Sequence, residues 1–326
     1  MSFVFYLVIL LVVLAGGIIF FNILYMRTPR YLNEYNAVRK FIDGVPDNLD
    51  IMNTGSNHAK NAIDWSLVGV NGFSLASGSQ SISWDYRLAK KYRHKVKKNH
   101  VILIVLIGLL FCFLEYPDDV SNRRYYHFLK PGEIPRGTFW KKIKYSIFPV
   151  LSNWKNFIYG FYRRGILFYE PAPSLAAAEW ESDNRIKGWQ NEFGLRDLQK
   201  RESMEHLKET IHEASLVMRN IIDESRAEGI VPVLMMPPFS AVINKKISDE
   251  FIKAVILDPV ADIAPDVPFL NYMKDERFQD YRYYYNGDFM NQAGREKFMP
   301  ILWQDIQSVV TVSYTHLRAH ETLMNL

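Results

Sequence analysis

The sequence predicts an α/β fold with a parallel sheet, preceded by one helix that spans a membrane. Three observations lead to this prediction. Short β-branched runs alternate with amphipathic helical patterns along most of the chain. The residues from Phe3 to Tyr25 include no charged side chain. About 285 residues follow, enough for one large folded domain with an insertion.

The N-terminal apolar segment predicts an uncleaved membrane anchor at residues 1–26. A helix needs about 20 apolar residues to cross the hydrocarbon core of a bilayer, and Phe3 to Tyr25 meets that length. No basic residue precedes the segment and no small-residue cleavage pattern follows it, which argues against a signal peptide. Arg27 and Arg30 follow the segment, so the positive-inside tendency alone would place the rest of the chain in the cytoplasm. Two charges give only a small bias.

A polar stalk is expected at residues 27–48, and the α/β pattern begins after it. The β-branched start at residues 101–105 suits a central strand buried on both faces, with a re-entrant membrane segment as the alternative. Apolar residues at helical spacing from Leu207 to Ile222 predict a long helix that Gly229 ends. We expect strands at 50–54, 69–76, 101–114, 230–236 and 267–270, and helices from 59 onward and at 85–91, 202–226 and 292–309.

A helical insertion is expected at about residues 115–195, inside an α/β domain that covers 49–311. Between Glu115 and Arg164 ten basic residues stand against four acidic ones, with aromatic residues interleaved. This composition suits an anionic membrane surface or a polyanionic polymer. A helical cap with its aromatic side chains packed inward is the other interpretation. Nucleic acid is not expected as a partner, because no recognised binding motif accompanies the basic residues.

The single cysteine and the C-terminal tail both bear on whether the chain has a disulfide or a metal site. Cys112 stands alone, so the chain has no disulfide framework and no cysteine metal site, and we expect no cofactor. The string from Val312 to Thr322 resembles a translated sequencing adapter, so residues 312–326 are treated as a probable artefact. His316 and His320 are therefore not considered as metal ligands, and no metal site is predicted.

One serine has the setting of a nucleophile. Ser56 follows the apolar-to-polar switch in Ile51-Met52-Asn53-Thr54-Gly55, and Gly55 permits a tight turn before a helix. A serine hydroxyl needs a base to accept its proton, and backbone N–H groups in such a turn can stabilise an oxyanion. A serine that caps a helix is the ordinary alternative for this string.

The order of several short motifs resembles the SGNH (GDSL-like) hydrolase superfamily. These motifs are Gly55-Ser56-Asn57-His58, the turn Gly78-Ser79-Gln80-Ser81, Pro237-Pro238 at a strand end, and Asn291-Gln292-Ala293-Gly294 before a final helix. The chain is most similar to the membrane-anchored branch found in teichoic-acid D-alanylation and exopolysaccharide clusters. The resemblance implies a three-layer flavodoxin-like fold, with Ser56 as nucleophile and Gly78 and Gln80 as oxyanion or substrate contacts.

The same resemblance implies O-acyl transfer or ester hydrolysis on an anionic or neutral cell-surface polymer. The domain would lie outside the membrane, with the lipid bilayer and a membrane acyltransferase as partners.

The late loop departs from the family pattern. Anchored on Asn291 and Gly294, the positions of the family's aspartate and histidine fall on Asn286 and Phe289. Asp288 is one residue away, but a carboxylate with a pKa near 4 is a poor base for serine.

His58 is not an obvious replacement for the missing base either. It follows Ser56 by two residues and on a helix would point away from it. Two interpretations stay open: an acyltransferase or esterase whose base is not located, or a catalytically inactive polymer-binding or assembly protein.

Overall fold

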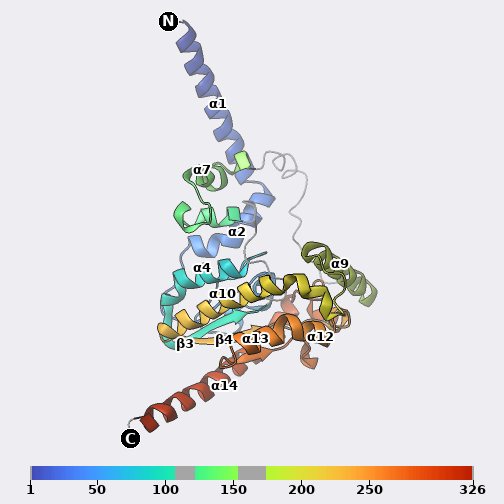
Figure 1. The fold of residues 1–326 in the computed structure, drawn as a ribbon. Coiled ribbons are helices and arrows are strands. Elements are labelled where there is room, and N and C mark those ends of the chain that lie inside the picture. The colour runs from blue at the N-terminus through green and yellow to red at the C-terminus, as the bar shows by residue number, and fades with distance from the viewer. Residues whose placement is uncertain (1, 107–121, 153–173, 325–326) are drawn as a thin grey trace. The chain divides into compact units, whose positions relative to one another are not determined.

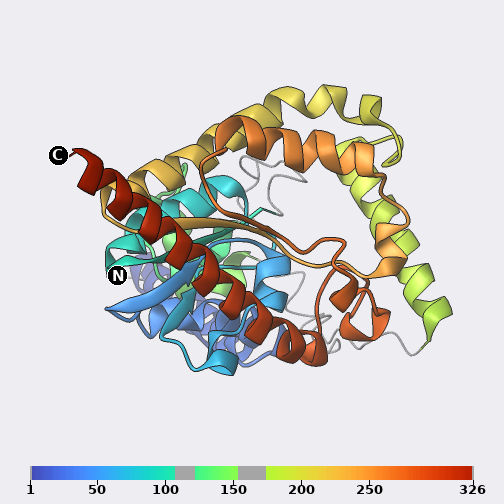
Figure 2. The same cartoon turned by 90° about the horizontal axis from the view of Figure 1, so that it is seen from below.

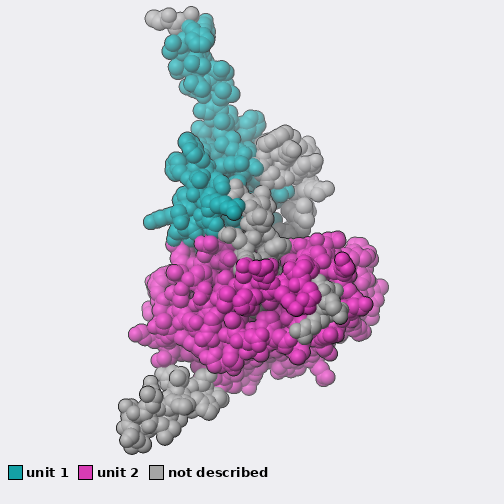
Figure 3. Space-filling model, in the orientation of Figure 1, with its two compact units in different colours: residues 1–45, 116–168 teal, residues 46–115, 169–326 magenta. Residues whose placement is uncertain are grey.

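The chain forms two compact units, which are described separately. The structure is a computed structural model that describes residues 2–106, 122–152 and 174–324. Residues 1–45 and 116–168 make up the first unit, and residues 46–115 and 169–326 make up the second (Figure 3). Cys112, the end of the predicted strand at 101–114 and part of the predicted insertion lie outside the described residues.

The second unit is built on a five-stranded sheet in which every neighbouring pair is parallel, as predicted. The strand order is β2-β1-β3-β4-β5, that of flavodoxin-like doubly wound folds. In such sheets ligands bind beyond the carboxyl ends of the strands, where the order reverses, which is here between β1 and β3. The strands are β1 (Leu49–Asn53), β2 (Gly72–Ser74), β3 (Val96–Val105), β4 (Val231–Met236) and β5 (Phe269–Asn271).

Helices cover both faces of this sheet. On one face, α3 (Asn57–Ala62) and α14 (Gln292–Met324) pack against each other and against an apolar cluster that includes Ile51, Leu103 and Met235. On the other face, α10 (Lys208–Ala227) packs against α4 (Ile82–Tyr92) and α13 (Asp258–Ile263). Figure 2 shows α14 crossing one side of the sheet and α10 with α13 on the other. The second unit is therefore a three-layer α/β fold.

The second unit contains further helices, most of them short. The longest is α9 (Leu175–Phe193), which packs against α11 (Ala241–Asn244). Although α9 falls within the predicted insertion at 115–195, it belongs to the second unit, whereas residues 116–168 belong to the first. The short elements are α12 (Asp249–Ile252), η1 (Trp65–Val68), η2 (Arg93–Lys95), η7 (Arg201–Leu207), η8 (Lys253–Leu257), η9 (Glu276–Phe278) and η10 (Tyr281–Tyr283).

The first unit begins with α1 (Ser2–Met26), which is long and apolar enough to cross a membrane. Most of the predicted stalk is helical, because Thr28 accepts a hydrogen bond from the backbone of Tyr31 and caps α2 (Pro29–Ile42). The other elements, coloured green in Figure 1, are η3 (Arg123–His127), η4 (Pro131–Glu133), α7 (Phe139–Lys142), η5 (Ile143–Ile147) and η6 (Pro149–Ser152).

Candidate functional site

The turn after β1 holds Ser56 where the strand order reverses. Gly55 has φ +122°, and a Cβ there would lie 2.6 Å from the Cβ of Ala59 and 3.0 Å from the Cβ of Val105. Only glycine fits, since any side chain would be strained and would collide with α3 and β3. Ser56 follows as the half-buried N-cap residue of α3, with the non-helical angles φ −109° and ψ −143°.

The buried carboxyl group of Asp85 forms a hydrogen bond with the backbone of this turn. Asp85 Oδ1 accepts a hydrogen bond of 2.9 Å from the Gly55 N–H and one of 2.6 Å from Nε2 of Gln80. Nε2 of Gln80 also lies 3.1 Å from the carbonyl oxygen of Gly55. Burial raises the pKa of Asp85 to about 7, although both hydrogen bonds favour its ionised form. The two side chains therefore fix both polar groups of the Gly55 peptide.

Gln80 and Gly78 are the predicted oxyanion or substrate contacts, and the hydrogen bonds of Gln80 show how its side chain is oriented. The amide nitrogen of Gln80 faces acceptors inside the protein, so the structure gives Gln80 a role in positioning the Ser56 turn. Gly78 lies in the turn that precedes α4.

Asn291 and Gly294 of the late loop lie at the start of α14. Oδ1 of Asn291 accepts from the N–H of Gly294 at 3.0 Å, which caps the helix. A Cβ on Gly294 would lie 2.4 Å from the carbonyl oxygen of Tyr283, so this position requires glycine. Asn286 closes the loop, because its Oδ1 accepts from the Phe289 N–H at 3.1 Å. The Asn–Gly frame is therefore explained by helix capping and close backbone packing.

Asp288 in this loop pairs with a histidine from the Ser56 turn. Nε2 of His58 lies 2.7 Å from Oδ2 of Asp288, and both side chains are buried. Nε of Arg185, on α9, donates to the same carboxylate oxygen at 3.0 Å. Three elements that are far apart in the sequence thus meet in one buried ionic cluster.

Aromatic rings enclose the cluster. The ring of Phe289 meets His58 edge-on with centroids 4.8 Å apart, and Phe239 stacks on His58 at 5.5 Å. The Arg185 guanidinium lies 4.6 Å from the Phe289 ring centroid and 4.9 Å from that of Trp189. Phe289, at the expected histidine position, is therefore a buried wall of the cluster.

The surroundings of the pair determine its protonation. Burial lowers the pKa of His58, and this effect outweighs the opposing influence of Asp288. Burial alone would raise the pKa of Asp288, but Arg185 and His58 hold it below its ordinary value. At neutral pH the pair is consequently a neutral imidazole that donates Nε2–H to a carboxylate.

The other ring nitrogen of His58 makes no hydrogen bond with the residues that the structure describes. This nitrogen, Nδ1, is buried. With the proton on Nε2, Nδ1 carries a lone pair and can accept a proton. The cluster therefore contains a base oriented by a carboxylate.

We gave His58 no role from the sequence, because residues i and i+2 of a regular helix face apart. Ser56 does not have helical backbone angles, so that rule does not fix the direction of its side chain. Arg185 and Trp189 were also missed, because α9 fell within the predicted insertion. The available signal was a histidine two residues after Ser56.

A pocket of about 200 Å³ opens between α9, α11 and η10. Leu175, Glu179, Lys245, Lys246 and Tyr281 are among its lining residues. Among the residues that the structure describes, no group of three histidine, cysteine or acidic side chains is arranged to hold a metal ion.

No protein-family model and no curated protein matches the chain.

Proposed function

We propose that this chain is a membrane-anchored SGNH-like acyltransferase or esterase of cell-envelope polymer biosynthesis, with Ser56 as nucleophile and His58 as base. One observation carries the proposal: the buried His58–Asp288 pair begins two residues after Ser56, at the carboxyl edge of the sheet. It supplies the base that the late loop lacks at Phe289.

In the proposed reaction, the Ser56 hydroxyl oxygen forms a bond to the acyl carbon while its proton passes to Nδ1 of His58. The carboxylate of Asp288 stabilises the imidazolium through the Nε2–H bond. The proton then moves to the leaving alcohol, which departs as the acyl–serine ester forms. A second alcohol or a water molecule takes the acyl group by the reverse steps.

The proposed setting follows from α1 and from the sequence resemblance. α1 holds the second unit at a bilayer, where a polymer and a membrane acyltransferase partner would be reached. In this proposal the second unit lies on the extracytoplasmic side. The acceptor is an anionic or neutral cell-surface polymer.

Phe289 supports a second candidate, a catalytically inactive polymer-binding or assembly protein. Its ring fills the side of the cluster where the resemblance expects a histidine, and it packs on both His58 and Arg185. In this alternative the ionic cluster is a structural remnant, and the pocket between α9, α11 and η10 binds the polymer.

A fluorophosphonate probe separates the two candidates. The full chain in nanodiscs is treated with the probe, and wild type is compared with Ser56→Ala, His58→Gln and Ser66→Ala. Ser66 is an exposed serine nearby whose hydroxyl bonds to Asp64, so it serves as the matched control. Labelling that requires Ser56 and falls at least 100-fold in His58→Gln supports the enzyme.

The binding alternative has its own expected result. A folded wild type that is not labelled, yet sediments with a polyglycerol phosphate or a neutral glucan, supports the inactive binding protein. Serine labelling that persists in Ser56→Ala contradicts the assignment of Ser56 as nucleophile, and it also contradicts the inactive alternative.

A further inference from the structure

The first unit exposes a group of large apolar side chains on one short segment. Residues 139–151 comprise α7, η5 and the start of η6. Phe139 is 64% exposed and Trp140 76%, with Ile147 at 49% and Leu151 at 47%. These four exposed side chains therefore lie close together along the chain. Such a patch normally marks an interaction surface.

Hydrogen bonds tie this segment to the C-terminal end of α1. Nδ2 of Asn22 donates to the carbonyl oxygen of Ile147 at 3.0 Å, and the Val150 N–H donates to Oδ1 of Asn22 at 3.3 Å. Val150 also packs with Tyr25 and Tyr31 in a small buried cluster. Figure 1 shows α7 beside this end of α1. The segment and the last turns of α1 therefore lie at one level.

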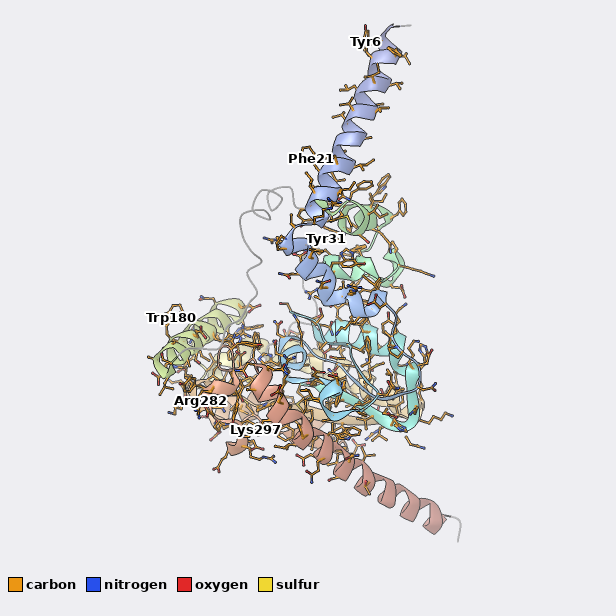
Figure 4. The ribbon with its side chains drawn as sticks, turned by 180° about the vertical axis from the view of Figure 1, so that it is seen from behind. Tyr6, Phe21, Tyr31, Trp180, Arg282 and Lys297 are labelled. Carbon is orange, nitrogen blue, oxygen red and sulfur yellow. The ribbon has the colours of Figure 1, made fainter. Side chains whose placement is uncertain are left out.

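The length of α1 indicates where its C-terminal end lies when the helix spans a bilayer. Its 25 residues span about 37 Å at 1.5 Å per residue, somewhat more than the roughly 30 Å of a hydrocarbon core. The side chains of Tyr6 and Phe21 point outward from the helix, as lipid-facing residues do (Figure 4). When α1 spans the membrane, Asn22 lies near the boundary between acyl chains and headgroups. Tryptophan and tyrosine are enriched at that boundary.

The positive charge of the segment favours lipids with anionic headgroups. Residues 136–152 contain Arg136, Lys141, Lys142 and Lys144 and no acidic residue. The ammonium group of Lys141 bonds to the backbone oxygen of Arg136, and that of Lys142 bonds to the backbone oxygen of Leu129. These contacts hold positive charge next to the exposed aromatic rings. Basic residues at a membrane surface attract anionic headgroups.

We propose that residues 139–151 form a membrane-docking surface that inserts Phe139, Trp140, Ile147 and Leu151 into the headgroup boundary of an anionic bilayer beside α1. Basic residues of the segment contact lipid phosphates, and the first unit is held against the membrane by two neighbouring attachments. This proposal requires that α1 spans the bilayer. It does not depend on any chemistry at Ser56.

Fluorescence quenching by brominated lipids tests the surface, because α1 contains no tryptophan. The full chain is placed in nanodiscs that contain anionic phosphatidylglycerol and a lipid brominated near the top of the acyl chain. Trp140→Phe is expected to lower the quenched emission at least twofold. The matched control is Trp180→Phe on α9 of the second unit (labelled in Figure 4), whose side chain is 67% exposed.

The charge requirement is tested separately with the triple variant Lys141→Gln, Lys142→Gln and Lys144→Gln. Its quenching in anionic nanodiscs is expected to fall to the wild-type value in neutral nanodiscs. The proposal is overturned if Trp140→Phe leaves the bromolipid quenching unchanged while aqueous acrylamide quenches Trp140. It is also overturned if a second copy of the chain, but not lipid, protects Trp140 from acrylamide, because the surface then binds a protein.

Discussion

The imidazole of His58 and the carboxylate of Asp288 lie 2.7 Å apart, although 230 residues separate them in the chain. The contact joins the turn after β1 to the loop before α14. Both partners are buried, and Arg185 balances the charge of the Asp288 carboxylate. Such groups are expensive to bury and often mark functional positions.

Asp288→Asn should lower the rate of Ser56 labelling by a fluorophosphonate about 10²- to 10⁴-fold. A carboxamide cannot stabilise the imidazolium of His58, and it also allows the ring to turn. The measurement is the labelling rate of the full chain at pH 7.5. Asp249→Asn is the control, because that carboxylate is 90% exposed and pairs with Lys274 at the surface. A folded Asp288→Asn protein that labels at the wild-type rate would contradict the role of the pair.

Arg185→Met should raise the pKa of His58. The cation opposes protonation of the imidazole in the wild type, so its removal makes the protonated ring more favourable. The pH below which Ser56 labelling declines should therefore move upward. NMR titration of the His58 ring gives the same quantity without any turnover, with His58→Asn to assign the signal.

Arg185→Lys provides the control for this effect. It keeps the positive charge while losing the guanidinium that lies over Phe289 and Trp189. Its His58 pKa should stay nearer to the wild-type value than that of Arg185→Met. A pKa that falls in Arg185→Met would show that the charge of Arg185 does not govern His58.

Gly55→Ala should destabilise the second unit by about 2–4 kcal/mol. The new methyl group would combine a strained φ of +122° with a contact of 2.6 Å to the Cβ of Ala59. Gly69→Ala is the matched control, since Gly69 has φ +64° and nothing within 4 Å of an added Cβ. It should cost about 1 kcal/mol. Equal losses in a urea titration would mean that the turn is not tightly packed.

The strands could be predicted from the sequence because their signal is local. Short apolar runs bounded by turn residues indicated all five, although β3 begins at Val96, where the sequence is polar. The Asn291–Gly294 frame was also visible, since a helix cap and its glycine lie within one turn.

The ionic cluster could not be predicted in the same way. It joins residues 58, 185 and 288, whose approach depends on how α9 packs on α11. No local pattern encodes that packing. In addition, the helix rule that turned His58 away from Ser56 assumed a helical residue, whereas Ser56 is a cap.

Asp85→Asn should remove a pH dependence of stability that arises beneath the Ser56 turn. Burial raises the pKa of Asp85 from 3.8 to about 7 on folding. Between these values the folded protein holds a proton that the unfolded chain has released, so the free energy of unfolding falls as pH rises. The contribution of Asp85 is fully present below pH 3.8 and is lost as pH passes through about 7.

Asparagine does not ionise, and its Oδ1 can still accept the hydrogen bonds from Gly55 and Gln80. Relative to wild type, Asp85→Asn should therefore gain up to about 4 kcal/mol between pH 4 and pH 8, measured by urea titration of the full chain in detergent. Gln80→Met provides a second test. Because the hydrogen bond from Gln80 lowers the pKa of Asp85, its loss should extend the decline in stability to higher pH. A difference between wild type and Asp85→Asn that does not change with pH would mean that Asp85 is ionised in the folded protein at every pH tested.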